Sequence, residues 1–541
     1  ELSELFGKIA LDLDKQHRVH RFRARALDQL ATIAGDHLPQ LQAYTDGVNA
    51  GLADLRVRPW PYVLLQTKPE PWQLSDTALA GYAMFFDLQG GTNERELALW
   101  RIRQAVPAAL YKLIAADGTE WDAPLEGVAR GNIALPDAAT LDLRKLPAPG
   151  IDGSPPYVDP NTPGSNNFAI AGALTKDGRA IVANDMHLGL RAPNIWFRAR
   201  LLYPDARAVD GKVDVSGFTL PGIPAVIVGS NTHVAWGFTN SYGDWADWVE
   251  DSDKAHPFTR DQYRRPEQTV VETIRVKGGS PFLLKVVERS EGIRMPDVAG
   301  VTTKLSLIWT AHFPGGLTLD MVDMAHAKDL DAAIHTATHA GIPAQNLLVA
   351  DRDGHIAWTI AGRIPRNPLN GSCDRTSPAI NYIPPPALPG PIVVKVVPSK
   401  NPKSTSVTRH DKDQGSDSNS SNDQPFSEAP RQCFSWAADQ VRAWDDYNPE
   451  IDNPSSNRLW TANNRVTDGF ALSTIGDSGY ALGARAKQIR DDLFAKNRFT
   501  EKDLLAIQLD NRTLFLERWW KQLRALVQSS NDPVLQRIEA A

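Results

Sequence analysis

The chain of 541 residues carries a net charge of −6, and 42% of its residues are hydrophobic and 23% charged. These shares are typical of a globular protein, and no apolar run approaches the ~20 residues that a membrane-spanning helix needs. The acidic balance, spread along the chain, gives no reason to expect a nucleic-acid partner. The length allows several ordinary domains or one large core with appended elements.

Two features bear on the cell compartment. The chain begins at Glu1 rather than at a methionine, so we expect that its natural start, with any signal peptide, is missing. Its two cysteines, Cys373 and Cys433, have none of the paired spacings of metal sites. One disulfide between them in an oxidising compartment and two free thiols are both open.

The first 145 residues are predicted to be mostly helical. Apolar side chains recur there at roughly helical spacing, at Leu27, Leu30, Ile33, Leu38 and Leu41. After a Pro-Trp-Pro turn around Trp60, a helix is predicted over residues 76–86 with Ser75 as its N-cap, and another from about Glu94. A basic cluster on an apparent helix is expected to form a solvated face; it comprises Arg18, Arg21, Arg23 and Arg25.

The composition changes over residues 146–164, where prolines alternate with glycines and exclude a helix or a central strand. We interpret this segment as an exposed, stiff connector. Directly after it, the short apolar runs 167–173 and 179–183 flank a Lys-Asp-Gly turn, which predicts a β-hairpin.

Strands and helices are predicted to alternate over the rest of the chain. The strand-like segments are 225–228, 234–238, 270–276, 282–287 and 305–309. Helices are predicted over residues 330–339 and from Ala481 onward. Residues 384–430, rich first in proline and then in Ser, Asn and Asp, are typical of a surface insertion that is disordered in part.

Gly164 and Ser165 lie where the connector meets the hairpin. On local pattern alone, residues 163–167 form a turn. A more specific hypothesis is self-cleavage, because Gly164 has no side chain to hinder attack of the Ser165 hydroxyl on its carbonyl carbon. Cleavage would free an α-amine with an unperturbed pKa of about 7.7–8.0, which suits a general base at neutral pH. Ser165 would then supply both nucleophile and base.

Residues 165–170, Ser-Asn-Asn-Phe-Ala-Ile, resemble the start of the β chain in the penicillin acylase family of N-terminal nucleophile (Ntn) hydrolases, which includes acyl-homoserine-lactone and cephalosporin acylases. Further blocks match the family in the same order over most of the chain. They lie at 184–188 (Asn-Asp-Met-His-Leu), 221–224, 229–231, 234–240, 243–247, 350–356, 362–366 and 461–465, with 44–50 and 68–72 resembling the α chain. Each block alone is weak, whereas the ordered set is specific.

The resemblance implies a role for each matched catalytic position. Ser165 would be the N-terminal serine released by cleavage after Gly164, and His187 would contact its amine and hydroxyl. The backbone N–H of Asn240 and the side-chain amide of Asn463 would form the oxyanion hole, where loss of one donor costs ~3 kcal/mol of barrier. Arg485 would position that asparagine and the new amine.

The resemblance also implies a structural calcium site. Asp244 and Asp247, with the carbonyl of Ala246 between them, would supply the hard oxygen ligands that Ca²⁺ prefers. Glu94 is the expected upstream ligand, with Glu96 as a competitor. Without the family, the two aspartates would be read as a solvated loop pair.

An acyl pocket is implied as well. Leu188 and Val228 match positions that line it, and Met84, Phe85 and Phe86 belong to a helix that often gates it. Ordinary core packing is the alternative for these side chains.

The implied fold is α+β: the four-layer α/β/β/α sandwich of Ntn hydrolases, wrapped by a helical α-chain-like region. The domains would be residues 1–145, a spacer at 146–164 ending at the cleavage site, and a β-chain-like region at 165–541 that is truncated relative to the family. The implied function is an acylase that self-cleaves before Ser165 and deacylates a penicillin-type β-lactam, an N-acyl-homoserine lactone or a related amide through an acyl-serine. Its partners would be such a small-molecule amide and its own α and β chains, without an organic cofactor, in the bacterial periplasm or outside the cell.

Two alternatives concern the function. A non-catalytic or maturation-defective homologue of the same fold stays open. A trypsin-like protease is suggested by Gly-Asp-Ser-Gly at 476–479 and Thr-Ala-His at 310–312. It is rejected because that fold needs a pair of β-barrels, whereas a helix pattern follows Gly479 almost at once and the connector and N-terminal helices have no place in it.

Overall fold

The computed structural model describes residues 1–116, 118–145, 164–189, 192–250, 267–289, 292–296, 304–365, 447–530 and 532–540. The predicted connector up to residue 163, the predicted insertion at 384–430 and both cysteines lie outside these ranges. In the part of the chain that is described, every helix is too short or too polar to cross a membrane.

The N-terminal region is helical, as predicted. Its helices are α1 (Leu2–Phe6), α2 (Leu11–Arg18), α3 (Phe22–Asp28), α4 (Leu30–Ala34), α5 (Leu38–Ala53), α6 (Trp60–Leu64), α7 (Leu74–Ala105) and α8 (Ala108–Ile114). The predicted turn around Trp60 is wrong in detail, because Trp60 begins the short helix α6, where Pro61 fits the first turn.

Helix α7 differs from its prediction at both ends. Gln73, not Ser75, is the N-cap, and it forms a capping box in which Asp76 Oδ2 accepts a hydrogen bond of 2.8 Å from the Gln73 N–H. The two predicted helices are one helix of 32 residues. No proline interrupts it, and Gly90 and Gly91 keep negative φ angles, so neither glycine ends it.

Two antiparallel sheets face each other in the main body of the molecule. The smaller sheet has the order β15 (Arg458–Thr461), β1 (Gly164–Ile170) and β2 (Ile181–His187). The larger one has the order β14 (Glu450–Asp452), β13 (Ile356–Ala361), β12 (Gln345–Asp351), β6 (Val234–Asn240), β5 (Val226–Ser230), β4 (Lys212–Thr219) and β3 (Phe197–Pro204). Strands β1 and β2 pack on β6 and β12, and Ala169, Leu348 and Trp358 fill the space between the sheets.

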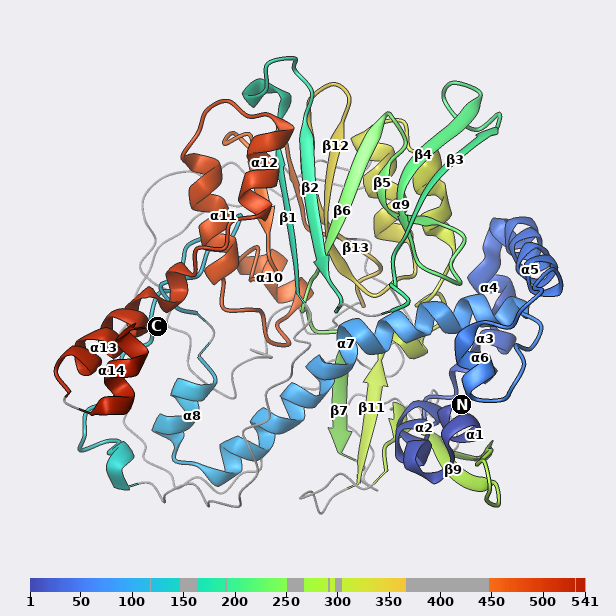
Figure 1. Ribbon diagram of the computed structural model, residues 1–541, viewed down its shortest axis with the longest axis horizontal. Coiled ribbons are helices and arrows are strands. Elements are labelled where there is room, and N and C mark those ends of the chain that lie inside the picture. The colour runs from blue at the N-terminus through green and yellow to red at the C-terminus, as the bar shows by residue number, and fades with distance from the viewer. Residues whose placement is uncertain are drawn as a thin grey trace, which may run out of the picture.

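Helices cover the outer face of each sheet. Helices α11 (Ala484–Phe494) and α12 (Glu501–Gln508) lie against the smaller sheet, and α9 (Leu330–His339) lies against the larger one (Figure 1). The order of layers is therefore helix, sheet, sheet, helix, which confirms the predicted sandwich. The helices α10 (Gly469–Ile475), α13 (Glu517–Gln528) and α14 (Pro533–Ala540) complete the C-terminal part.

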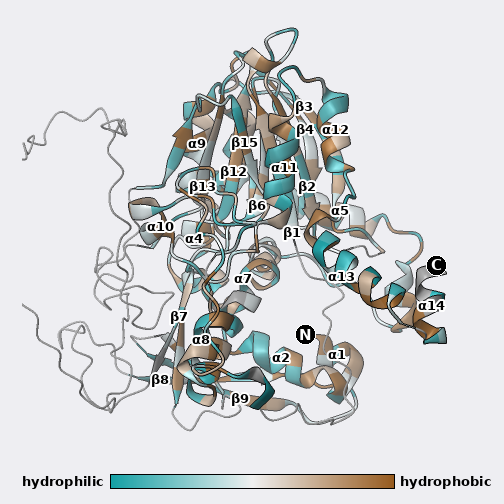
Figure 2. Cartoon of the chain, turned by 90° about the vertical axis from the view of Figure 1, so that its left-hand side faces the viewer, coloured by the Kyte–Doolittle hydropathy of each residue, from teal (hydrophilic) through white to brown (hydrophobic). Residues whose placement is uncertain are grey.

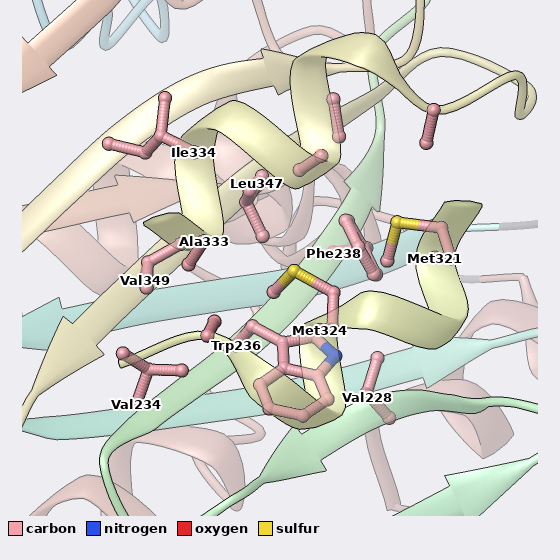
Figure 3. Packing of buried hydrophobic residues seen from close by; sticks show 14 of the residues in the cluster. Val228, Val234, Trp236, Phe238, Met321, Met324, Ala333, Ile334, Leu347 and Val349 are labelled. Carbon is pink, nitrogen blue, oxygen red and sulfur yellow. The ribbon is translucent and has the colours of Figure 1, made fainter. Parts of the chain in front are cut away.

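The core beneath α9 is made by alternating side chains of the larger sheet. Trp236 and Phe238 of β6 and Leu347 and Val349 of β12 point to the same side, where Met324 joins them (Figure 3). The α9 face that covers them contains small residues such as Ala333 and Ala337, whose size lets the helix approach the sheet closely.

The predicted hairpin after the connector is confirmed. Strands β1 and β2 pair antiparallel in a register that sets Gly164 opposite His187 and Ser165 opposite Met186. Gly178 lies in the connecting turn with a φ of 80°, a conformation that glycine adopts without strain.

A second sheet body lies below α7 in Figure 1. It has the order β7 (Ala246–Glu250), β11 (Leu305–Trp309), β10 (Gly292–Arg294), β9 (Phe282–Arg289) and β8 (Gln268–Ile274). Each strand that was predicted between residues 225 and 309 is present, with its ends shifted by up to two residues.

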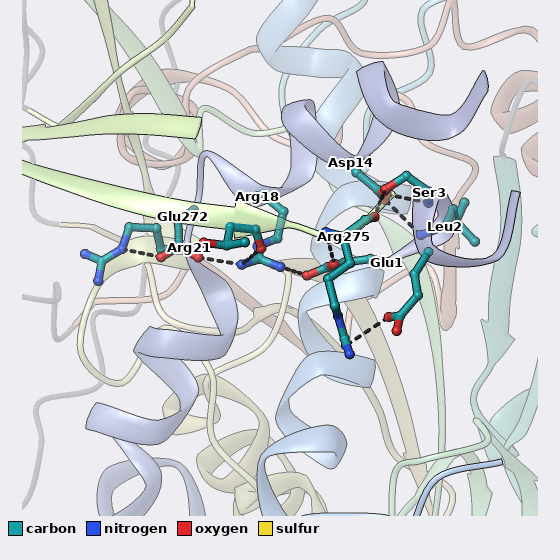
Figure 4. Close-up of polar contacts among 10 residues, drawn as sticks. Glu1, Leu2, Ser3, Asp14, Arg18, Arg21, Glu272 and Arg275 are labelled. Atoms are coloured by element: carbon teal, nitrogen blue, oxygen red, sulfur yellow. Dashed lines mark hydrogen bonds and ion pairs between the residues drawn. The ribbon is translucent and has the colours of Figure 1, made fainter. Parts of the chain in front are cut away.

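The prediction of a solvated basic face near the N-terminus is wrong for three of its four arginines. Arg18 pairs with Glu272 of β8 at 2.6 Å, Arg21 pairs with Glu272 and Glu288, and Arg25 pairs with Glu288 of β9 at 2.6 Å. Figure 4 shows Arg18 between Glu1 and Glu272. Helical spacing cannot show that a hairpin with two glutamates, about 250 residues later in the chain, will cover this face.

Candidate active site

Ser165 is the second residue of β1 and is buried. Its Oγ donates a hydrogen bond of 2.6 Å to the carbonyl oxygen of Gly164, and its backbone N–H donates one of 2.7 Å to Asn463 Oδ1. Strand alternation turns Ser165 to the side of the larger sheet, whereas Asn166 faces α11 and accepts a hydrogen bond from Arg485. The hydroxyl and the amide nitrogen of one residue are thus both held in place.

Asn463 and Arg485 surround the Ser165 backbone. Asn463 follows β15 in the left-handed region, with a φ of 66°, and its Oδ1 also accepts a hydrogen bond of 2.8 Å from Arg485 Nη2. Arg485 Nη1 donates to the carbonyl oxygen of Ser165 at 2.7 Å. Burial lowers the pKa of Arg485 from its ordinary value. The chain brings these three residues together although about 300 positions separate Ser165 from Asn463.

The loop that carries Asn463 is fixed by the α-chain-like region. Asn464 donates to the carbonyl oxygen of Ala123 at 3.0 Å, and Arg465 forms a buried ion pair with Asp122. Because both partners of this pair are buried, removing either one is expected to destabilise the loop. No local sequence signal identified Asp122 or Arg465 as supports of the site.

Asn240 ends β6 and lies next to Asn463, whose Nδ2 donates to the Asn240 carbonyl oxygen at 3.1 Å. The Asn240 side chain donates to the carbonyl oxygen of Leu88 at 2.6 Å and accepts from Gln345 Nε2 at 3.1 Å. The resemblance implied no role for this side chain, since a backbone donor tolerates any residue. In the structure, the hydrogen bond from this side chain to Leu88 links α7 to the end of β6.

His187 lies opposite Gly164 at the end of β2. Its Nε2 is 2.8 Å from Asp185 Oδ2, and this hydrogen bond is the main cause that lowers the pKa of Asp185. A β-carbon placed on Gly164 would lie 3.3 Å from His187 Nδ1 and 3.2 Å from Arg485 Nη2. The groups around the Gly164–Ser165 bond therefore leave little room for any residue other than glycine.

Ser165 is one of the residues that line an apolar pocket of about 1010 Å³, a volume that includes space open to solvent. Met84, Leu188 and Val228, all predicted for the acyl pocket, line it, together with Leu88, Ile227, Phe238 and Leu319. No charged side chain is found among the described residues of its wall. Its chemistry suits a hydrocarbon group placed next to the Ser165 hydroxyl.

Phe85 and Phe86, predicted to gate the pocket, do not line it. Phe85 is fully buried against Trp309, and Phe86 packs edge-on against Phe22 and Trp309. Successive residues of α7 point in different directions, so the helix presents Met84 to the pocket and these two rings to the core beside it. For both Phe85 and Phe86, the alternative interpretation, ordinary core packing, is therefore the correct one.

The predicted calcium ligands are brought together only in part. Asp244 and Asp247 are buried at the start of β7, so they are not a solvated loop pair, and Ala246 pairs with Trp309 in the sheet. Glu94 is exposed on α7. Within the described ranges, no three His, Cys, Asp or Glu side chains are grouped closely enough to hold an ion. The expected three-carboxylate set is not formed, and calcium binding stays a prediction.

The sandwich, the buried serine near the start of β1 and the comparison with known families indicate the same family. The penicillin amidase family model matches residues 1–540, and the chain belongs to this family. Among curated relatives, it is 25% identical over 391 residues to the acyl-homoserine lactone acylase QuiP of Pseudomonas aeruginosa, covering 67% of this chain and 44% of the relative. It is 29% identical over 348 residues to the penicillin acylase 2 proenzyme of Pseudomonas sp. strain SE83, covering 61% and 42%.

The chain thus spans less than half the length of the curated relatives that it matches. A solved structure, the penicillin G acylase of Alcaligenes faecalis, is similar with a TM-score of 0.43 at 16% identity, over 68% of this chain and 56% of that one.

Proposed function

We propose that this protein is an amide hydrolase that cleaves its own Gly164–Ser165 bond and then deacylates N-acyl amides through an acyl-serine intermediate. The observation that carries the proposal is that Ser165, which contacts Asn463 and Arg485, also lines an apolar pocket. The names of the two relatives, an acyl-homoserine lactone acylase and a penicillin acylase, support the same reaction class.

The amine that cleavage releases would act as the general base. In the uncleaved chain the Ser165 nitrogen already donates to Asn463 Oδ1, so the amine would stay in this place. The Arg485 guanidinium, bonded to both Asn463 Oδ1 and the Ser165 carbonyl oxygen, disfavours a second positive charge there. The neutral amine keeps a lone pair that can take the proton of the Ser165 hydroxyl.

The oxyanion would be held by Asn463 and Asn240. An amide NH₂ group has two protons, and the Asn463 group uses one of them on the Asn240 carbonyl oxygen. The other proton, with the backbone N–H of Asn240, would serve the tetrahedral oxyanion, each donor contributing ~3 kcal/mol. The amine then gives its proton to the leaving nitrogen, and water releases the acid from Ser165.

The pocket favours an aliphatic acyl group as the substrate part that it binds. Its wall is mostly Leu, Ile, Val and Met side chains. We expect the cleaved protein to hydrolyse octanoyl-p-nitroanilide and N-octanoyl-homoserine lactone faster than p-nitroacetanilide, with phenylacetyl-p-nitroanilide as the aromatic comparison. Location in the periplasm or outside the cell remains a prediction.

The pocket assignment is tested with Val228→Phe. The larger ring should fill the pocket and lower kcat/KM for octanoyl substrates at least ~10-fold, with a smaller effect on the acetyl substrate. The control is Val271→Phe on β8, where the side chain is exposed. Failure of the cleaved wild-type protein to hydrolyse every amide in this panel would contradict the proposed function and favour a non-catalytic homologue.

A further inference from the structure

We infer that His37 and Asp323 are positioning residues that fix one wall of the apolar pocket, and with it the preference of the pocket for long acyl groups. This inference rests on the proposed function and assigns a role in substrate selectivity to two residues outside the pocket. His37 lies in the helical N-terminal region, whereas Asp323 lies in the β-chain-like region. The pair would therefore join the two chains of the cleaved protein.

The wall in question is formed by the 3₁₀-helix η7 (Asp320–His326). Met321 and Val322 of this helix line the pocket. Residues three apart in a 3₁₀-helix lie on the same edge, so Asp323 and His326 share one edge of η7. Other elements can therefore hold the helix by this polar edge while its apolar residues line the pocket.

His37 holds this edge from the helical region. It ends the 3₁₀-helix η2 (Gly35–His37), directly before α5, and is 3% exposed. His37 Nε2 lies 3.2 Å from Asp323 Oδ2. His37 Nδ1 is buried without a hydrogen-bond partner in the part of the chain that is described, so the ring depends on Asp323 for its polar contact. The backbone joins the two regions at the same place, because the Leu319 N–H donates a hydrogen bond of 2.9 Å to the carbonyl oxygen of Ile33.

Charged groups of the turn between β3 and β4 hold the other oxygen of Asp323. Arg207 Nη1 lies 3.4 Å from Asp323 Oδ1, and His326 Nδ1 lies at the same distance from this oxygen. Asp205 accepts a hydrogen bond of 3.1 Å from Arg207 Nη2, and its Oδ2 lies 2.9 Å from His326 Nε2. The Asp323 carboxylate thus connects the helical region to the β3–β4 turn, with η7 between them.

The electrostatics of the pair show which partner depends more on the contact. The hydrogen bond with Asp323 is the main cause that raises the pKa of His37, and it is also the main cause that lowers the pKa of Asp323. The Asp323 side chain is 41% exposed, so water can solvate it, whereas the His37 ring is buried. Removing Asp323 would leave the buried ring without a partner, which is costly. We therefore expect its loss to loosen the contact between η2 and η7 and to shift the pocket wall.

The alternative is an ion pair that only stabilises the fold. Its loss would then lower the amount of folded protein and reduce the hydrolysis of all amides alike. A shifted wall would instead weaken the binding of acyl groups that are long enough to reach Met321 and Val322, and would spare an acetyl group. The comparison of an octanoyl with an acetyl substrate within one variant separates the two cases.

The test measures kcat and KM of the cleaved protein for octanoyl-p-nitroanilide and p-nitroacetanilide. We expect Asp323→Ala to raise KM for the octanoyl substrate at least ~5-fold, to change kcat less than ~2-fold, and to leave KM for the acetyl substrate unchanged. Asp323→Asn should restore most of the octanoyl KM, because its side-chain oxygen can still accept a hydrogen bond from His37 Nε2. Asp351→Ala is the matched control, since it removes a His–Asp pair with His355, 3.0 Å long, at the turn between β12 and β13.

A double variant tests whether the two residues act as a pair. Adding His37→Gln to Asp323→Ala should raise the octanoyl KM no further, because the contact is already lost. A further rise would overturn the inference, since His37 would then act independently of Asp323.

The remaining outcomes are also decisive. A wild-type octanoyl KM in Asp323→Ala would overturn the inference and leave the proposed function intact. So would equal losses for both substrates, or the same change of selectivity in Asp351→Ala, since either would show a general loss of folded protein. A cleaved wild-type protein that hydrolyses no amide would overturn the proposed function and this inference with it.

Discussion

At the residue scale, the absence of a side chain at Gly164 is as much part of the site as the Ser165 hydroxyl. The strand β1 runs straight through the Gly164–Ser165 bond, which we propose is cleaved, and three polar groups converge on this bond from β2, the loop after β15 and α11. The sequence motifs located these residues because each lies in a short block that resembles the family. Arg465 also lies in such a block, at 461–465, but neither it nor Asp122 was assigned a role, since their ion pair joins positions 343 residues apart.

Gly164→Ala should slow self-cleavage at least ~10-fold, because its methyl group would press on His187 Nδ1 and Arg485 Nη2 and shift both. The rate is measured by the appearance of the two chains on a denaturing gel. Gly47→Ala in α5, where a β-carbon meets no atom within 4 Å, is the control and should cleave like the wild type. Equal rates in the wild type and Gly164→Ala would contradict the steric account of this position.

At the element scale, α7 connects the helical region to the catalytic strands. Met84 and Thr77 of this helix line the pocket, and the carbonyl oxygen of Leu88 receives the Asn240 side chain. Its length was not predicted: two helices were expected, over residues 76–86 and from about Glu94, where the structure has one continuous helix. Strands β12 and β13 were not predicted either, because both of their faces are buried and no alternation marks them.

The capping box of α7 gives a stability prediction. Asp76→Ala removes the bond to the Gln73 N–H and the ion pair with Arg23, and should lower the free energy of unfolding by ~1 kcal/mol. Arg23 is 54% exposed, so its ion pair contributes little to this loss. Chemical denaturation measures the change. Gln104→Ala, exposed near the other end of α7, should be nearly neutral, and a similar loss there would argue against the cap.

At the scale of the whole molecule, the helical region and the five-stranded sheet meet in an interface with a buried histidine pair. His20 Nδ1 lies 2.9 Å from His312 Nε2, next to Phe22 and Trp309. Burial, helped by the charge of Arg25, lowers the pKa of His20 to about 3 and that of His312 well below its ordinary value. Sequence alone could not show that these rings meet, since they are 292 positions apart.

This pair makes the fold sensitive to acid. Both rings have a lower pKa in the folded state than the 6.5 of an unfolded chain, so unfolding takes up protons as the pH falls from about 6.5 towards 3. The free energy of unfolding should therefore fall by up to ~1.4 kcal/mol per pH unit for each ring in this window. Above about pH 6.5, the contribution of both rings to stability should be fully present. His312→Gln should flatten the dependence of Tm on pH between 7 and 5 relative to the wild type. His335→Gln, an exposed control on α9, should leave the dependence unchanged, and the same curve for all three proteins would contradict the assignment.

The C-terminal helices show that an amphipathic sequence pattern does not reveal whether the apolar face of a helix is buried. Both α11 and α13 are amphipathic, and the apolar side of α11 is buried through Ala486, Ile489 and Leu493. Helix α13, by contrast, exposes Trp519, Trp520, Leu523 and Leu526 and lies apart from the sandwich with α14 (Figure 2). Periodicity predicted both helices, but only the packed structure distinguishes the buried face from the exposed one.

The central claim, that Ser165 becomes an N-terminal nucleophile, is tested most directly by the intact mass of the purified protein. The account predicts that the wild type consists of two chains, of which the second begins at Ser165, and that Ser165→Ala remains a single, inactive chain. A wild-type protein of undivided mass that still hydrolyses amides, or a Ser165→Ala variant that is cleaved and active, would contradict it.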